Sequence, residues 1–449
     1  MAKDMTTGSS TKLILLFTLP VLFGNLFQTL YTIIDTIIVG QYLGVNALAA
    51  VGSTSSLTFI VFGLVTGMTS GFGILISQAF GAKDERLLRH YTAMSTYLSI
   101  GFAILMTALL LISNHAVLRL MNTPDNIYAD TYIYIAIIYA GFPISIFYNF
   151  LASIARALGD SRTPLYFLII SSVLNVVLDI LLVAVIPLGV AGAAIATVIA
   201  QGVSAILCFF YTWKKYPLIH FHKEDAIVNW RTIRALLSMG IPMALQFSIT
   251  GIGTVIVQSA LNLFGATYIA TYSSAMKIQN FAVQFYPSLG VAMATYSGQN
   301  FGAGKMHRIR EGVRNSMICC AIYSVVLMVI AYFFFAPMIT MFTADPTGEL
   351  QQIATQFYHI SLWFYPELGF IFIYRNTLQG IGNGFVPMLG GVAELIARAL
   401  VIIFLTAPLG FVGILLSDPI AWVSALIPLV PYYYWYMTKQ KRLEQASNT

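Results

Sequence analysis

Residues 36–82 read TIIVGQYLGVNALAAVGSTSSLTFIVFGLVTGMTSGFGILISQAFGA and contain no Asp, Glu, Lys or Arg. Similar charge-free runs occupy residues 180–213 and 235–276. Each run is longer than the ~20 apolar residues that cross a bilayer core as a helix. The chain is therefore expected to be a polytopic, all-α integral membrane protein.

The overall composition supports this class. Of the 449 residues, 58% are hydrophobic and 9% are charged, and the mean hydropathy is +0.81. Soluble globular proteins carry about 25% charged residues, so an ordinary soluble enzyme is excluded. The formal net charge of +6 does not indicate a nucleic-acid partner, because most Lys and Arg lie in short clusters between apolar runs. The three cysteines, Cys208, Cys319 and Cys320, lie in apolar segments without metal-ligand spacing.

Charges and turn residues divide the chain into twelve expected spans. They cover residues 13–39, 47–77, 91–113, 131–154, 164–186, 190–213, 236–261, 268–298, 315–336, 352–375, 386–406 and 412–437. If the N-terminus is cytoplasmic, 20 of the 23 Lys and Arg residues lie in cytoplasmic loops, and Arg375 is counted among them. The three exceptions are Arg119, Lys277 and Arg398. By the positive-inside rule, both termini are expected in the cytoplasm and the protein in the cell (inner or plasma) membrane.

The two halves of the chain repeat each other. Residues 78–82 read QAFGA and residues 299–303 read QNFGA, an offset of 299 − 78 = 221. Pro20 and Pro242 are 222 apart. Six spans per half is an even number, so the halves form parallel repeats, as in many transporters with a central cleft. The expected division is an N-lobe at 1–215, a cytoplasmic linker at 216–234 and a C-lobe at 235–449.

These features resemble the multidrug and toxic compound extrusion (MATE) family. The resemblance covers nearly the whole chain and rests on the twelve spans, the paired turns, the Pro20…Asp35 arrangement and the ALGD turn at 157–160. It implies the DinF-like branch, with a cation or proton site at Asp35, Asn175, Asp179 and Thr197 and with Asn149 nearby. The stretch after Pro242 lacks the carboxylate of the NorM-like branch, so no such site is implied in the second half.

The residue types in the first half point to the same site. A carboxylate inside hydrocarbon costs at least ~2.5–3.5 kcal/mol on insertion scales, and the first six expected spans contain no Lys or Arg. Asn175 and Asp179 are four apart and share one helix face. Oxygen ligands suit a hard cation such as Na⁺, and repulsion between two carboxylates favours a proton on one of them. The alternative is that each carboxyl bonds a neighbouring hydroxyl or amide and only joins helices.

The second half replaces this group with a paired one. Glu394 and Arg398 are four apart, in the favourable order for a structural ion pair. By the repeat, Arg398 stands at the position of Asn175 (398 − 175 = 223) and Asp418 at that of Thr197 (418 − 197 = 221). The rival interpretation is that Asp418 or Glu367 takes a proton or contacts a cationic drug. The candidate residues of the substrate cleft are Tyr31, Met68, Phe285, Glu367 and Asp418.

The sequence therefore predicts a secondary-active multidrug exporter. It would expel amphipathic, often cationic, compounds in exchange for Na⁺ or H⁺ by alternating access, as a monomer in the bilayer, with no cofactor and no enzymatic activity. A lipid-linked oligosaccharide flippase is the alternative within transport, and a membrane-embedded enzyme is the alternative outside it. The absence of a phosphate-binding loop means that no direct ATP coupling is encoded. Pro20 is expected to act as a hinge in the first span, unless it only marks the first turn of that helix.

Overall fold

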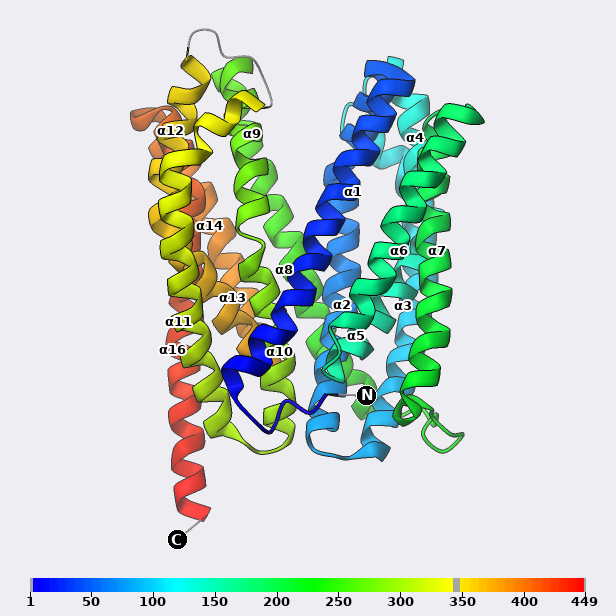
Figure 1. The fold of residues 1–449 in the computed structure, drawn as a ribbon, viewed down its shortest axis with the longest axis vertical. Coiled ribbons are helices and arrows are strands. Elements are labelled where there is room, and N and C mark those ends of the chain that lie inside the picture. Colours follow the sequence, from blue (N-terminus) through cyan, green and yellow to red (C-terminus); the bar gives the residue numbers. More distant parts are fainter. Residues whose placement is uncertain (1–2, 342–347, 448–449) are drawn as a thin grey trace. The chain divides into compact units, whose positions relative to one another are not determined.

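The structure is a computed structural model that describes residues 3–341 and 348–447. Every regular element in these ranges is helical (Figure 1). The first half comprises α1 (Ser10–Ser53), α2 (Ser55–Gly81), α3 (Glu85–Leu120), α4 (Asp125–Ala140), α5 (Phe142–Ala157), α6 (Arg162–Asp179), η1 (Ile180–Val185), α7 (Val190–Lys215) and η2 (Pro217–Ile219). The second comprises α8 (Trp230–Leu261), η3 (Asn262–Phe264), α9 (Ala266–Ala282), α10 (Phe285–Gly302), α11 (Met306–Ile330), η4 (Ala331–Phe335), η5 (Pro337–Met341), α12 (Glu349–Ser361), η6 (Leu362–Phe364), α13 (Tyr365–Gly380), α14 (Phe385–Leu409), α15 (Phe411–Leu415) and α16 (Ser417–Ser447).

These helices form the twelve spans that the sequence predicts. Among the described residues, nine helices are long and apolar enough to cross a membrane by themselves. A tenth span is the pair α4 and α5, which bends by 45°. The pairs α9–α10 and α12–α13 supply the remaining two, each broken by a short interruption.

The chain folds into two compact units. The first contains Met1–Asp4 and Leu19–Ala244, and the second contains Met5–Thr18 and Leu245–Thr449. These units differ from the expected division in three places. The expected linker at 216–234 belongs to the first unit. Residues 5–18 pack with the second unit, where Met5 N donates to Gln299 Oε1 at 2.8 Å and Lys305 Nζ donates to Thr6 O at 2.8 Å. Residues 235–244, the beginning of α8 after its first turns, pack with the first unit.

The internal repeat is visible in the backbone. Gly44, inside α1, and Gly265, before α9, have φ of 83° and 90° and are 221 residues apart. Gly189 and Gly410 directly precede α7 and α15 with φ of 63° and 59°, again 221 apart. Such left-handed conformations favour glycine because it has no Cβ. The two halves therefore turn at equivalent positions.

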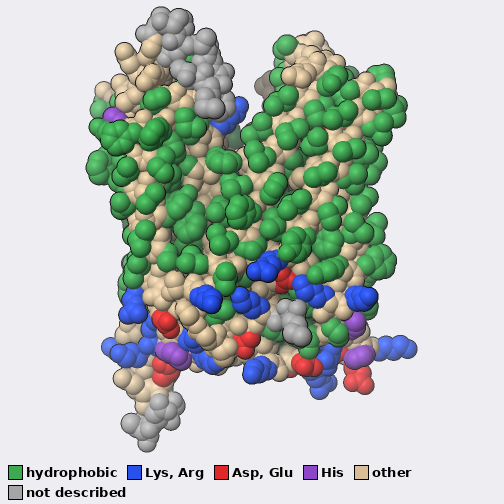
Figure 2. All heavy atoms as spheres, viewed as in Figure 1, with side chains coloured by type: hydrophobic (Ala, Val, Ile, Leu, Met, Phe, Trp, Pro, Cys, Tyr) green, Lys and Arg blue, Asp and Glu red, His purple; other side chains and the backbone are tan. Residues whose placement is uncertain are grey.

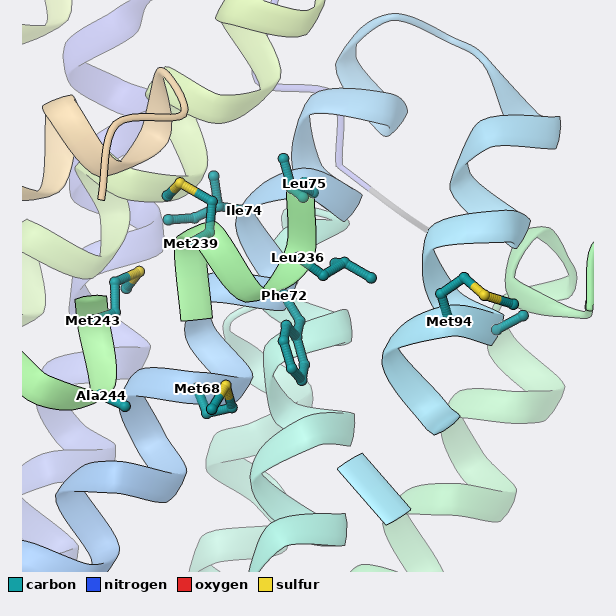
Figure 3. Packing of buried hydrophobic residues seen from close by; sticks show 10 residues of the cluster. Met68, Phe72, Ile74, Leu75, Met94, Leu236, Met239, Met243 and Ala244 are labelled. Atoms are coloured by element: carbon teal, nitrogen blue, oxygen red, sulfur yellow. The ribbon is translucent and has the colours of Figure 1, made fainter. Parts of the chain in front are cut away.

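The first unit has a core built on close helix packing between α2 and α8 (Figure 3). A Cβ on Gly71 would lie 2.6 Å from Cα of Gly240, so the two backbones touch there. Small residues permit this approach between membrane helices. Met68 and Phe72 on α2 then pack against Met239 and its neighbours on α8. This contact explains why the first part of α8 belongs to the first unit.

Charged side chains gather at one end of each unit, whereas hydrophobic side chains cover the flanks of the helices (Figure 2). In the first unit, Asp160 caps α6 by accepting from Arg162 N at 2.9 Å and from Thr163 N at 3.1 Å. Lys215 Nζ donates to Asp160 at 2.7 Å, and the Tyr216 hydroxyl also donates to it. Burial opposes ionisation, but the bonds from Lys215, Thr163 and Tyr216 outweigh it and lower the pKa of Asp160 to about 2. This buried network ties α6 to the end of α7.

Candidate cation site

Two carboxyl groups face each other inside the first unit. Asp35 lies in α1 and is half-buried, and Asp179 is the last residue of α6 and is fully buried. Their side chains interact electrostatically with one another. The backbone widens into the π-helical segment η1 directly after Asp179, a deviation that is frequent at functional sites.

The acceptor oxygens around these carboxyls lack donors. In the part of the chain that the structure describes, Asp35 Oδ1, Asn175 Oδ1 and both carboxylate oxygens of Asp179 are buried without a hydrogen-bond partner. The amide of Asn175 donates instead to Thr197 Oγ1 at 3.3 Å, and Thr197 donates to Ala193 O at 3.1 Å. A buried polar atom without a partner costs about 1–3 kcal/mol, and more when it is charged. A proton or a hard cation would satisfy this group of oxygens.

Two tyrosines complete the surroundings. Tyr31, one turn before Asp35, and Tyr134 on α4 both lie within electrostatic range of Asp35 and Asp179. Tyr134 is buried and belongs to the packed cluster around Ile38 and Val183. The sequence analysis placed Tyr31 in the cleft and did not identify Tyr134, because a tyrosine in an apolar span has no distinguishing pattern.

Asn149 has a different set of contacts. Its amide donates to Ser145 O on its own helix α5 at 2.8 Å, and the Ser145 hydroxyl donates to Gln201 on α7 at 2.5 Å. Among the described residues, no hydrogen bond joins Asn149 to the carboxyl group of Asp35 or Asp179. No group of three or more His, Cys, Asp or Glu gathers anywhere in the described ranges.

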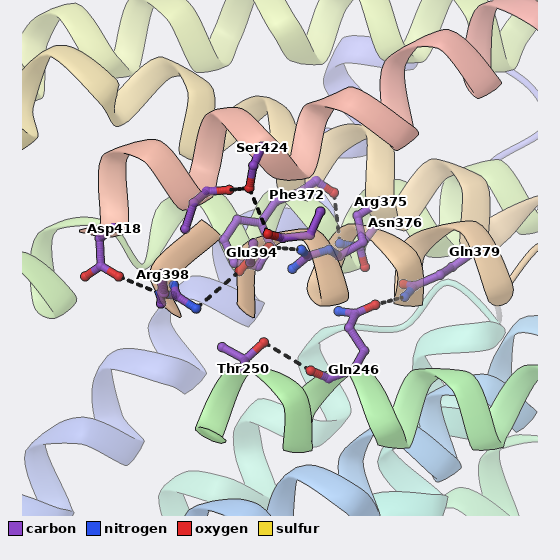
Figure 4. A network of polar contacts seen from close by, with 12 residues as sticks. Gln246, Thr250, Phe372, Arg375, Asn376, Gln379, Glu394, Arg398, Asp418 and Ser424 are labelled. Atoms are coloured by element: carbon purple, nitrogen blue, oxygen red, sulfur yellow. Dashed lines mark hydrogen bonds and ion pairs between the residues drawn. The ribbon is translucent and has the colours of Figure 1, made fainter. Parts of the chain in front are cut away.

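The second unit contains a chain of four charges, of which Arg375, Glu394 and Arg398 are buried and Asp418 is partly exposed (Figure 4). Arg375 on α13 pairs with Glu394 on α14, Glu394 lies 3.7 Å from Arg398, and Arg398 Nε lies 2.9 Å from Asp418 Oδ1 on α16. The placement of Arg375 in a loop is wrong, since its side chain is buried within α13. α13 continues to Gly380, so a residue expected at the end of the span is internal to the helix. The two arginines and two acids balance in formal charge.

The remaining cleft candidates are distributed through both units. Met68 belongs to the α2–α8 core of the first unit. Phe285 is buried in the second unit and stacks on Tyr323 with ring centroids 4.4 Å apart. Glu367, in the first turn of α13, has one buried oxygen without a partner among the described residues.

The duplicated helical units and the buried polar group of the first unit define a polytopic membrane transporter with two equivalent halves. The MatE family model matches residues 20–181 and again residues 242–404. The two matches start 242 − 20 = 222 residues apart, the offset of the internal repeat. The chain belongs to the MatE family.

Relatives and solved structures agree with this assignment. The chain is 27% identical over 438 residues to the probable multidrug resistance protein YoeA of Bacillus subtilis, covering 95% of this chain and 94% of the relative. It is 22% identical to the multidrug export protein MepA of Staphylococcus aureus, covering 90% and 89%. A structure of the outward-facing conformation of a multidrug resistance MATE family transporter superposes with a TM-score of 0.91 at 20% identity, covering 98% of each chain.

Proposed function

We propose that this protein is a multidrug efflux antiporter that exchanges amphipathic, often cationic, compounds for Na⁺ or H⁺. The observation that carries the proposal is the group of oxygens at Asp35, Asn175 and Asp179 that have no hydrogen-bond partner among the described residues. The family membership and the names of the relatives support export of small molecules as the cargo.

The coupling step depends on the uncompensated charge of this site. When both carboxyls are ionised, they repel each other at close range in a medium of low dielectric constant. Binding of H⁺ or Na⁺ between Asp35 and Asp179 removes this repulsion and gives the orphaned oxygens a partner. The amide oxygen of Asn175 offers a further ligand, oriented by the bond from its NH₂ group to Thr197. Ion binding thus changes the interactions of α1 with α6.

A mobile α1 would transmit this change. α1 passes from the second compact unit to the first between Thr18 and Leu19, and Pro20 is the next residue. Pro20 is in the helix interior, ten residues after Ser10, so the first-turn alternative does not describe its position. Proline removes a backbone hydrogen bond and clashes with the preceding turn. In the proposed cycle, the helix bends near Pro20 when Asp35 gains an ion.

The second unit is proposed to be a structural counterpart without its own coupling ion. Arg375 and Arg398 neutralise Glu394 and Asp418, so this group has no excess negative charge for a cation. The same pairing argues against the flippase alternative, because these arginines are already occupied by carboxylates rather than available to a pyrophosphate group. The basic ends of both units would face the cytoplasm, with both termini there and one chain as the transport unit.

Purified protein in liposomes provides the test. Dye efflux is measured under an imposed Na⁺ gradient, under an imposed H⁺ gradient, and under neither. Efflux that follows one of the gradients and disappears without it supports antiport. Equal efflux with and without both gradients would refute ion coupling.

A further inference from the structure

An apolar cavity opens on the first unit away from the carboxyl pair. Its volume is about 420 Å³, and it lies among α3, α5, α7 and the segment that follows α7. Ile100 and Ile104 on α3, Phe147 on α5 and Trp213 on α7 line it and are each more than a third exposed. Since these residues lie on membrane-spanning helices, the cavity opens toward lipid.

The lining presents little polar chemistry. The hydroxyls of Thr92 and Thr96 donate to their own helix, at Leu88 O (2.9 Å) and Thr92 O (2.8 Å). The remaining hydroxyl on this stripe, Ser99 Oγ, is buried and has no hydrogen-bond partner among the described residues. The cavity therefore suits a hydrocarbon chain with at most one acceptor, such as an ester oxygen.

The length of the cavity matches one leaflet. Its lining on α3 runs from Thr92 to Ile104, twelve residues that rise by about 18 Å at 1.5 Å per residue. Half of the ~30 Å hydrocarbon core is about 15 Å. One acyl chain can therefore follow α3 from the membrane surface toward the bilayer midplane.

The mouth of the cavity has the features of a membrane interface. Trp213 stacks on His220 with ring centroids 4.0 Å apart, and His220 Nε2 lies 2.8 Å from Trp213 O. Ile219 and Phe221 then fold over the cavity. Farther along the same segment, the side chains of Ile227, Val228 and Trp230 are each about two-thirds exposed. Aromatic and apolar residues at this level contact lipid headgroups and upper acyl chains.

Basic residues adjoin the lining residue Trp213 in the sequence. Lys215 is paired with Asp160, and Asp225 accepts from Arg89 at 2.9 Å. Lys214, next to Trp213, is exposed and has no ion-pair partner among the described residues. Basic residues beside a membrane surface attract anionic lipids. We propose that this cavity binds one chain of an anionic glycerophospholipid whose headgroup is held at Lys214.

A single-tryptophan protein tests the proposal directly. The chain has five Trp residues, and Trp230, Trp363, Trp422 and Trp435 are changed to Phe so that Trp213 alone reports on the cavity. The protein in detergent is titrated with phosphatidylglycerol or phosphatidylcholine that is dibrominated in its acyl chains, and quenching of Trp213 fluorescence is measured. Saturable quenching is expected, with half-saturation several-fold lower for the phosphatidylglycerol.

Matched variants distinguish specific binding in the cavity from nonspecific contact with surrounding lipid. Thr96→Phe fills the cavity and should abolish saturable quenching, whereas Ile112→Phe, on the exposed side of α3, should not. Ile100→Phe serves as the second filling variant if Thr96→Phe fails to fold, as judged by size exclusion. Lys214→Gln should remove the preference for phosphatidylglycerol, and Lys441→Gln should leave it.

Three outcomes would overturn the assignment. Unchanged quenching in the filled variants means that only annular lipid is seen. Equal quenching by the two lipids in the parent protein means that the mouth does not select an anionic headgroup. Displacement of the brominated lipid by a cationic dye at the concentrations that drive efflux means that the cavity binds drug instead. None of these readouts depends on transport, so the lipid-binding proposal and the antiport proposal are tested independently.

Discussion

Nε of Arg398 lies 2.9 Å from Oδ1 of Asp418, at the two positions that repeat Asn175 and Thr197 of the first half. In the first half the equivalent helices, α6 and α7, are joined by the amide–hydroxyl bond between Asn175 and Thr197, at 3.3 Å. The two halves therefore share a contact at equivalent positions but differ in its charge. Near this contact, the first half retains carboxylates that no described Lys or Arg pairs, whereas the second half pairs Glu394 and Asp418 with arginines.

Removing one carboxyl of the first unit should stop coupling. Asp35→Asn and Asp179→Asn each delete a negative charge that no Lys or Arg compensates, so the fold loses no ion pair. Ion-driven dye efflux in liposomes is expected to fall to the level of empty liposomes, while the melting temperature changes by only a few degrees. Normal efflux by Asp35→Asn would rule out the proposed cation site.

The opposite result is expected in the second unit. Glu394→Gln leaves both Arg375 and Arg398 without their shared carboxylate, and breaking a buried ion pair costs about 3–5 kcal/mol. Thermal unfolding in detergent should show a large drop in the melting temperature. Asp35→Asn is the matched control, because it also neutralises an acid within a span. A stable Glu394→Gln protein would show that the four-charge chain contributes little to folding.

Close backbone packing between α2 and α8 gives a third prediction. Gly71→Ala places a Cβ 2.6 Å from Cα of Gly240, so the helices must separate. Overpacking of this kind costs about 1–3 kcal/mol, and a lower melting temperature and reduced yield are expected. Gly101→Ala on α3 is the control, since no atom lies within 4 Å of its Cβ position. Equal melting temperatures for the two variants would contradict the contact.

The turn at Asp160 should make stability depend on pH in a defined window. Its pKa is about 2 in the folded protein and about 3.9 in an unfolded chain. Because the folded pKa is depressed, the stabilisation is complete above pH ~4 and is lost as the pH falls toward ~2. Asp160→Asn should therefore have a lower melting temperature than the parent at pH 7, and the difference between the two melting temperatures should become smaller below pH 4. Glu224→Gln, at an exposed linker residue, should have the same melting temperature as the parent. A melting-temperature difference between Asp160→Asn and the parent that stays constant down to pH 3 would show that ionised Asp160 is not its cause.

The sequence predicted the parts of this fold that depend on apolar length and on turns. Charges and turn residues set the twelve expected spans, and the matching turns at 78–82 and 299–303 marked the repeat. The sequence also brought Asn175 and Asp179 onto one helix face. Their proximity to Asp35 rested on the family resemblance, because α1 and α6 are far apart in the chain.

Contacts between distant apolar helices could not be predicted in this way. Arg375 was read as the end of a span because a charge normally marks the water boundary, and its partner Glu394 is 19 residues away on another helix. Tyr134 was missed because its partners are on α1 and α6. The shift of residues 5–18 into the second unit depends on hydrogen bonds to Gln299 and Lys305, which no local pattern shows.

The two prolines of the repeat give the last prediction. α1 changes compact unit between Thr18 and Leu19, beside Pro20, and α8 changes unit between Ala244 and Leu245, beside Pro242. Both helices thus carry a proline where they pass from one unit to the other.

Alanine restores the missing backbone donor and favours a helix by about 3 kcal/mol over proline. Pro20→Ala should therefore stiffen α1 and slow dye efflux several-fold, while equilibrium binding of the dye stays near the parent value. Pro242→Ala should act in the same direction, and Pro428→Ala, inside α16 and within one unit, should not. Efflux rate and dye affinity are measured on the same preparation, and unchanged efflux in both Pro20→Ala and Pro242→Ala would rule out bending at these positions while leaving the cation site untouched.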